Sequence, residues 1–297
     1  MYLRFTHITF SDNKKTVSPG EQGFTLIELS IVLVIIGLIV GGILVGQDLI
    51  RAAEVRAEIS QIQKYSTAVN TFRSKYNAIP GDMAVSTAST FGFTVGTSCA
   101  GAAGERDGNG LVEGNAAAGL GQVIGETGLF WQDITSSTAG NLIEGQFPNS
   151  NAAAAVCAAN VALTTTAGAT FIGDNMPAAK IGHGNFVFVY TTSGYNWWGV
   201  ENITAVAVTT GQLTGTGTIP VMQAYNMDKK VDDGIPTTGN VQAVYVTGSV
   251  TATTLANNAA ADAATTCYNT SLSAQGIYSI GFNQGNIGNC ALSFRFN

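Results

Sequence analysis

The stretch Gly23-Phe24-Thr25-Leu26-Ile27-Glu28-Leu29 runs straight into residues without charge as far as Gln47. Residues 29–46 are close in length to the helix of roughly 20 residues that spans a bilayer. Glu28 lies at the entrance of this apolar segment, where a carboxylate costs roughly 2.5–3.5 kcal/mol on insertion scales unless a partner neutralises it. The stretch therefore predicts a membrane-spanning helix, at about residues 29–47, that begins with an acid in need of a partner.

A glycine followed by Phe-Thr-Leu-Ile-Glu and a long apolar helix resembles the N-terminus of type IV prepilins and type II secretion pseudopilins. The resemblance implies that a prepilin peptidase cuts between Gly23 and Phe24. The cut would remove residues 1–23 as a leader and leave Phe24 as the N-methylated first residue. The resemblance also implies that Glu28 pairs with the α-amino group of a neighbouring subunit as a helical filament assembles. Such a pair can set the register between subunits without being a dependable net stabiliser.

The resemblance also implies a function and a place in the cell. The expected function is that of a structural subunit of a type IV pilus or a type II secretion pseudopilus, not of an enzyme. The alternative is a minor pilin whose head acts as an adhesin or a priming tip. The expected partners are the prepilin peptidase, other pilin or pseudopilin subunits and an inner-membrane assembly platform. Before assembly the chain would cross the inner membrane of a Gram-negative bacterium once, with its head in the periplasm. Afterwards it would lie in a pilus or pseudopilus, in the envelope or at the cell surface.

Three other interpretations of the apolar stretch compete with this one. A secretory signal needs a small-residue cleavage site after the apolar run, and residues 47–54 offer no convincing one. A plain single-pass anchor fits the hydropathy but leaves Glu28 unexplained. A buried core helix rarely contains so long an unbroken apolar run.

Beyond the apolar run the chain predicts an amphipathic continuation of the same helix. Apolar residues recur there at intervals of three and four, and Pro80-Gly81 ends the pattern. We therefore expect one helix from about Thr25 to about Tyr76, within an N-terminal region of residues 24–79. The apolar stripe comprises Ala52, Val55, Ile59, Ile62, Val69, Phe72 and Tyr76, with Tyr65 beside it, and most of the opposite side comprises Arg51, Glu54, Arg56, Glu58, Lys64 and Arg73.

Residues 80–297 are expected to form one globular, β-rich head domain. The predicted fold class is α+β: a pilin-like lollipop in which the long helix, half in the membrane and half amphipathic, packs on an antiparallel β-sheet head. A further helix is predicted at residues 126–142. The predicted strands, rich in β-branched and aromatic residues, are Asn185–Thr191, Tyr195–Val200, Ile203–Thr209, Ile219–Tyr225, Val241–Thr247, Ile277–Phe282 and Ala291–Phe296.

The chain has four cysteines, and none of them forms a CxxC pair. An even number of cysteines in an exported protein favours disulfides over metal ligation. Three pairings are possible. We expect Cys267–Cys290, which would tie down the last strand, together with Cys99–Cys157 in the loop-rich part of the head.

Two acidic loops raise the question of a bound calcium ion. Asp228, Asp232 and Asp233 lie close together before a glycine, and the family resemblance supports calcium there because some secretion pseudopilins bind this ion in a C-terminal loop. Glu105-x-Asp107-x-Asn109-Gly110 imitates the start of a calcium loop, but its twelfth position is Ala116 rather than a glutamate. For both loops the competing interpretation is a solvated turn.

Composition and motifs argue against two other classes of protein. The net charge is −6, and removal of residues 1–23 would make the chain more acidic, which disfavours binding of nucleic acid through its phosphates. The sequence holds no nucleophile elbow, phosphate loop or metal-ligand cluster, and His183 lies in a predicted turn.

Trp197 and Trp198 should face opposite sides of a strand, so at most one could be displayed as a binding platform.

Overall fold

We describe residues 24–95, 106–114, 123, 125–147, 169–206, 212–246, 253–255, 266–271 and 273–296 of a computed structural model. Contacts divide the chain into two units, Met1–Leu49 and Ile50–Asn297. The first helix, α1 (Leu26–Tyr76), contributes to both. Its N-terminal part is exposed, since Gly46 is the one residue between Phe24 and Leu49 that is half-buried. Among the described residues, α1 is the one helix that is long and apolar enough to cross a membrane.

The part of α1 that belongs to the second unit buries one stripe of side chains in the head. Seven of the nine buried positions follow one another at alternating intervals of three and four residues, and Gln61 and Ala68 lie beside that stripe. Tyr65 lies at the centre of this stripe, with its ring centroid 5.0 Å from that of Trp131 and 5.7 Å from that of Trp198. The helix ends where Asn77 adopts a left-handed conformation, with φ 53°. The buried stripe comprises Val55, Glu58, Gln61, Ile62, Tyr65, Ala68, Val69, Phe72 and Tyr76.

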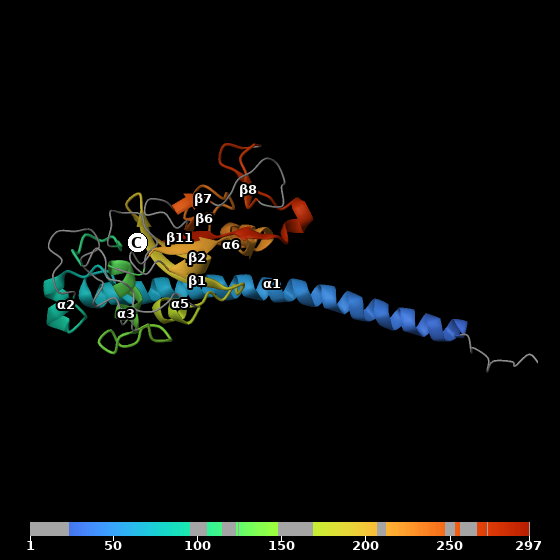
Figure 1. Cartoon of the computed structure of the whole chain (residues 1–297), viewed down its shortest axis with the longest axis horizontal. Coiled ribbons are helices and arrows are strands. Elements are labelled where there is room, and N and C mark those ends of the chain that lie inside the picture. The colour runs from blue at the N-terminus through green and yellow to red at the C-terminus, as the bar shows by residue number, and fades with distance from the viewer. Residues whose placement is uncertain are drawn as a thin grey trace, which may run out of the picture. The chain divides into compact units, whose positions relative to one another are not determined.

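The head is built around a five-stranded antiparallel sheet with the order β1-β2-β11-β5, in which β3 pairs with the far end of β2. The longest strand, β2, pairs through residues 195–202 with the whole of β1, and with β11 and β3 over different parts of its other edge. Figure 1 shows this sheet beside the second half of α1. The strands are β1 (Asn185–Thr192), β2 (Tyr195–Val206), β3 (Leu213–Thr216), β5 (Val241–Gln242) and β11 (Leu292–Phe296). The predicted α+β layout, a long N-terminal helix with an antiparallel sheet, is confirmed.

Shorter elements surround this sheet. Three two-stranded ladders join β4 to β10, β6 to β7 and β8 to β9. The ladder strands are β4 (Ile219–Pro220), β6 (Val244–Val246), β7 (Thr253–Leu255), β8 (Tyr268–Asn269), β9 (Ile277–Tyr278) and β10 (Gly288–Cys290). The helices are α2 (Val85–Phe91), α3 (Glu126–Thr135), α5 (Ala169–Asn175), α6 (Val221–Val231) and the short 3₁₀ turn η1 (Phe282–Gly285).

Several predicted elements differ from the structure. The predicted strand Ile219–Tyr225 was wrong: after β4 the chain turns into α6, whose buried residues Val221, Ala224 and Met227 recur at helical spacing. The helix predicted at residues 126–142 ends at Thr135 because Ser136 is extended and starts a turn. The strands predicted at 195–200 and 203–209 are one strand, β2, as far as Val206.

The tryptophan pair is not a displayed platform. Trp197 is 5% exposed and Trp198 is not exposed at all, so both belong to the core. The side chain that remains at this place on the surface is Tyr195, which is 39% exposed, with the Arg295 guanidinium 3.3 Å from the centroid of its ring.

The predicted disulfide between Cys267 and Cys290 is present, with the two Cα atoms 5.0 Å apart. It joins the start of the β8–β9 ladder to β10 and closes a loop with a sequence separation of 23. A loop of this size is stabilised by about 3 kcal/mol in the chain-entropy account of disulfides. The predicted partners Cys99 and Cys157 lie outside the described residues.

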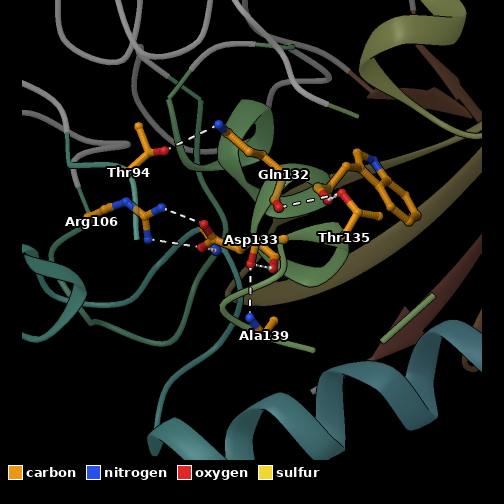
Figure 2. Close-up of polar contacts among 9 residues, drawn as sticks. Thr94, Arg106, Gln132, Asp133, Thr135 and Ala139 are labelled. Carbon is orange, nitrogen blue, oxygen red and sulfur yellow. Dashed lines mark hydrogen bonds and ion pairs between the residues drawn. The ribbon is translucent and has the colours of Figure 1, made fainter. Parts of the chain in front are cut away.

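A buried ion pair holds the exit of α1 against α3. The Arg106 guanidinium donates two hydrogen bonds to the Asp133 carboxylate, at 2.7 and 3.0 Å, and both residues are 1% exposed. Figure 2 shows this pair with its neighbours on α3 and the following turn. The Gly81 N–H donates to the same carboxylate at 2.8 Å. Gly81 has φ +84°, and a Cβ there would lie 2.3 Å from the Glu126 carbonyl oxygen, so this close approach requires glycine.

Glu58 was predicted on the exposed side of α1, and that prediction was wrong, because Glu58 is not exposed at all. Its Oε2 accepts a hydrogen bond from the Ile181 N–H at 2.8 Å, while Oε1 is buried with no hydrogen-bond partner among the described residues. One turn later, the Gln61 side chain accepts from the Lys180 N–H and donates to the Ala178 carbonyl oxygen. The two polar side chains thus fasten the segment after α5 to α1.

Burial raises the pKa of Glu58 to about 7 from 4.5. Between these pH values the unfolded chain loses the proton while the folded chain keeps it, so stability falls as pH rises from about 4.5 to about 7. We expect Glu58→Gln to remove this part of the pH dependence, worth about 3 kcal/mol. Thermal unfolding of the full chain in detergent, followed from pH 4.5 to 8, measures it. The exposed Glu144→Gln is the matched control, and a parallel loss of slope in both variants would contradict the assignment.

Candidate functional site

The start of α1 is closed by a capping box made of Thr25 and Glu28. Oε2 of Glu28 accepts hydrogen bonds from the N–H and the hydroxyl group of Thr25, both at 2.7 Å. The Glu28 N–H in turn donates to Thr25 Oγ1 at 3.3 Å. This is the arrangement in which a threonine before the first helical turn and a glutamate three residues later satisfy each other's backbone donors. The sequence-based prediction missed the role of Thr25, although the Thr-x-x-Glu spacing was visible.

The capping box leaves the Glu28 carboxylate accessible. Among the described residues its hydrogen bonds all go to Oε2, so Oε1 is open to a further donor. Glu28 and its neighbours are exposed, and Phe24 is 82% exposed. The site therefore combines an accessible carboxylate with an uncovered apolar helix. The apolar side chains are unfavourable in water, and the carboxylate is unfavourable in a bilayer unless it has a partner. The predicted processing residue Gly23 lies just outside the described residues.

Residues 19–44 match the prokaryotic N-terminal methylation motif. The chain carries a type IV prepilin-type leader. The matched prepilin-type motif includes Gly23, Phe24 and Glu28 and extends into the apolar part of α1. The predicted resemblance to prepilins and pseudopilins is thereby confirmed. Neither the curated proteins nor the solved structures gave a match to the chain.

The prepilin-type motif gives a coarse account of what the chain does. It indicates a structural protein of the pilin type, a class that is generally without enzymatic activity. It implies processing by a prepilin peptidase and assembly with other pilins. The exposed apolar part of α1 fits membrane anchoring.

Asp228, Asp232 and Asp233, predicted as a calcium site, do lie together at the end of α6. One carboxylate oxygen from each lies within 4.8 Å of the others. The ion pairs of the described residues are Arg106–Asp133 and Lys64–Glu144, so none of the three aspartates is paired with a basic side chain there. Burial is the main cause that raises the pKa of Asp228 to about 6. Its carboxylate accepts from the Tyr278 hydroxyl and the Gly234 N–H, at 2.8 and 3.0 Å.

The other two aspartates hold the loop that follows α6. Asp232 accepts from the backbone N–H groups of Asn240 and Val241, and Asp233 accepts from the Ile235 N–H and the Thr238 hydroxyl. These bonds explain part of the cluster without an ion, because each carboxylate stabilises a turn. The arrangement is nevertheless compatible with calcium, which takes six to eight oxygen ligands from carboxylates, carbonyls and water.

A second group of acids joins Asp107 to two carboxylates that the sequence did not single out, Asp82 and Glu126. Their oxygens also lie within 4.8 Å of one another. Asp82 accepts from three successive backbone N–H groups, those of Gly108, Asn109 and Gly110, at 2.8–3.1 Å. Burial, together with the negative charge of Asp82, raises the pKa of Glu126 to about 9. Glu105, the first residue of the predicted loop, lies outside the described residues, as does Ala116 at its twelfth position.

Proposed function

We propose that this chain is a structural subunit of a type IV pilus or a type II secretion pseudopilus that assembles through α1. The observation that carries the proposal is the prepilin-type motif at residues 19–44, placed on an exposed apolar helix whose first turn carries Glu28. On this proposal residues 1–23 are the leader, residues 24–79 form the N-terminal helical region and residues 80–297 form the head.

Glu28 is assigned the pairing role in assembly. The amine created by a cut between Gly23 and Phe24 would be a charged donor, and the open Oε1 of Glu28 in the next subunit is an acceptor that suits it. Inside a bilayer or a filament core the pair relieves each group of the cost of being charged alone. The subunit would meet the assembly platform in the inner membrane, with its head in the periplasm of a Gram-negative bacterium, before it enters the filament.

The experiment that tests the proposal is the intact mass and N-terminal fragment spectrum of the protein from a membrane or sheared-fibre fraction. The expected chain begins at N-methylated Phe24. A chain that keeps Met1, or one cut beyond Gln47, would overturn the proposal. The alternative role, a minor pilin at the tip, predicts the same N-terminus but a trace amount of protein relative to the main fibre subunit.

We also propose that the Asp228–Asp232–Asp233 cluster binds calcium, which would neutralise three carboxylates that have no basic partner among the described residues. Calcium at about a hundred times its Kd adds about 2.7 kcal/mol to stability, which raises the melting temperature by about 5 °C in a head of this size. We expect Asp233→Asn to remove most of this shift in the full chain in detergent. Asp174→Asn, an exposed aspartate on α5, is the control. An unchanged melting temperature in wild type, or loss of the shift in D107N instead, would contradict the assignment.

A further inference from the structure

We propose that one corner of the head, formed by Ile50, Arg51, Phe282 and Asn286, rests on the surface of the lipid bilayer while the chain is anchored in the membrane. We call these four residues the lipid-facing corner. The inference rests on the membrane-anchored stage of the proposed function and adds a partner for the head at that stage, namely the headgroup layer around the chain's own anchor.

The lipid-facing corner is held together by a contact between residues far apart in the sequence. Nη1 of Arg51 donates a hydrogen bond to Oδ1 of Asn286 at 2.6 Å. On the next turn of α1, Glu54 accepts from the Gln223 side chain of α6 at 2.7 Å, so the start of α6 lies against the same part of α1. Beyond Asn286, the disulfide-bonded Cys290 anchors β10. The turn that carries Phe282 is thus fixed to α1 at its first head residues.

Two large apolar side chains are uncovered at this corner. Ile50 is 60% exposed and Phe282 is 41% exposed. Single exposed apolar side chains are common on proteins. These two indicate a lipid contact because of where they lie relative to the membrane-spanning segment. In Figure 1 the red segment that contains Phe282 lies beside α6, at the end of the head farthest from α2.

Chain connectivity fixes how far this corner can lie from the membrane. The uncharged run ends at Gln47, and Arg51 follows four residues later. Four residues span about 6 Å as a helix and at most about 14 Å when fully extended. The headgroup layer on each side of the hydrocarbon core is about 5–8 Å thick. If residues 29–47 span the bilayer, Arg51 therefore lies within or just above the headgroups, whatever angle the two units adopt.

The side chains of the corner suit that layer. An aromatic ring is favoured at the level of the headgroups, and an arginine can place its guanidinium there while its stem contacts apolar groups. Asp48 lies in the same stretch and opposes attraction to anionic lipids. The apolar contact made by Phe282 is therefore expected to contribute more than the charge of Arg51.

Quenching of tryptophan fluorescence by brominated lipid tests the inference. The full chain is reconstituted in phosphatidylethanolamine–phosphatidylglycerol vesicles whose acyl chains carry bromine near the glycerol end. The natural tryptophans 131, 197 and 198 are buried and give a constant background, which is subtracted using wild type. F282W is compared with F91W, since Phe91 on α2 is a phenylalanine of similar exposure, 47%, at the other end of the head. L38W, in the middle of the apolar run, reports whether α1 is inserted, and it is measured in vesicles whose acyl chains carry bromine near their methyl ends.

We expect the signal of F282W to fall by about half in brominated vesicles, as for a ring at the headgroup level, and that of F91W to stay unchanged. Quenching of L38W without quenching of F282W would overturn the inference and leave the membrane anchor intact. Equal quenching of F282W and F91W would overturn it too, because the contact would not be confined to this corner. Absence of quenching in L38W would overturn both the anchor and the inference.

Discussion

We expect Glu28→Gln to remove this chain from the sheared-fibre fraction while its amount in the membrane stays the same. The amide keeps an oxygen that can accept the Thr25 N–H bond seen at 2.7 Å, but it cannot pair as a charge with the amine of a neighbouring subunit. Loss of one member of a buried pair costs about 3–5 kcal/mol, which corresponds to a decrease in incorporation of at least about a hundredfold. Quantitative immunoblots of fibre and membrane fractions measure both amounts.

Thr25→Ala is the matched control for the assembly variant. It removes the hydroxyl of the capping box and costs about 1 kcal/mol at the helix end, but it keeps the carboxylate. Incorporation should therefore stay within a few fold of wild type. Wild-type levels of E28Q in the fibre fraction would show that Glu28 acts through the cap of its own helix and that assembly does not use its charge.

We expect Arg106→Met and Asp133→Asn each to lower the free energy of unfolding by about 3–5 kcal/mol, because each leaves a buried charge without its partner. The double variant keeps the Gly81 N–H bond to the side chain at 133 and removes both charges together. We expect it to be more stable than either single variant. Denaturant unfolding of the full chain in detergent, analysed as a double-mutant cycle, gives the coupling energy.

The expected coupling comes from charge burial, so its size should depend little on salt. An exposed pair, Lys64–Glu144, provides the comparison within the same head. Breaking it with Glu144→Gln should change stability much less than breaking the buried pair, because an ion pair in solvent contributes little. If the Arg106 and Asp133 variants cost no more than this exposed pair, or if their effects simply add, the pair does not hold the exit of α1 against α3.

The parts of the molecule set by local pattern were predictable from the sequence. The apolar run and the intervals of three and four residues determined α1, because a helix face repeats on that period and the core needs one continuous stripe. Glu28 stood out because a carboxylate beside an apolar run is costly. The disulfide between Cys267 and Cys290 was predicted because it would tie down the last strand of the head. That strand is present as β11.

The parts that depend on contacts between distant segments were not predictable in the same way. Glu58 looks like a surface residue until the segment around Ile181 supplies its hydrogen-bond donor. Asp82 and Glu126 become neighbours of Asp107 only when the exit of α1 packs on α3. The segment from β4 into α6 resembles one strand because Ile219 and Val221 are β-branched, and from Val221 onward the packing of one helix face overrides that weak local preference.

The strand order has a consequence for export. β11 lies between β2 and β5, although it follows both of them in the chain. Part of one edge of the long strand β2 pairs with Leu292–Phe296. The backbone groups of that edge have no strand partner until those residues have been translated and translocated. A head delivered across a membrane from its N-terminal side would therefore wait, with unpaired backbone groups, for almost all of its sequence to emerge. Translocation and folding of this head would then be successive events, and the intermediate that waits for β11 would be the species most exposed to proteases and to chaperones.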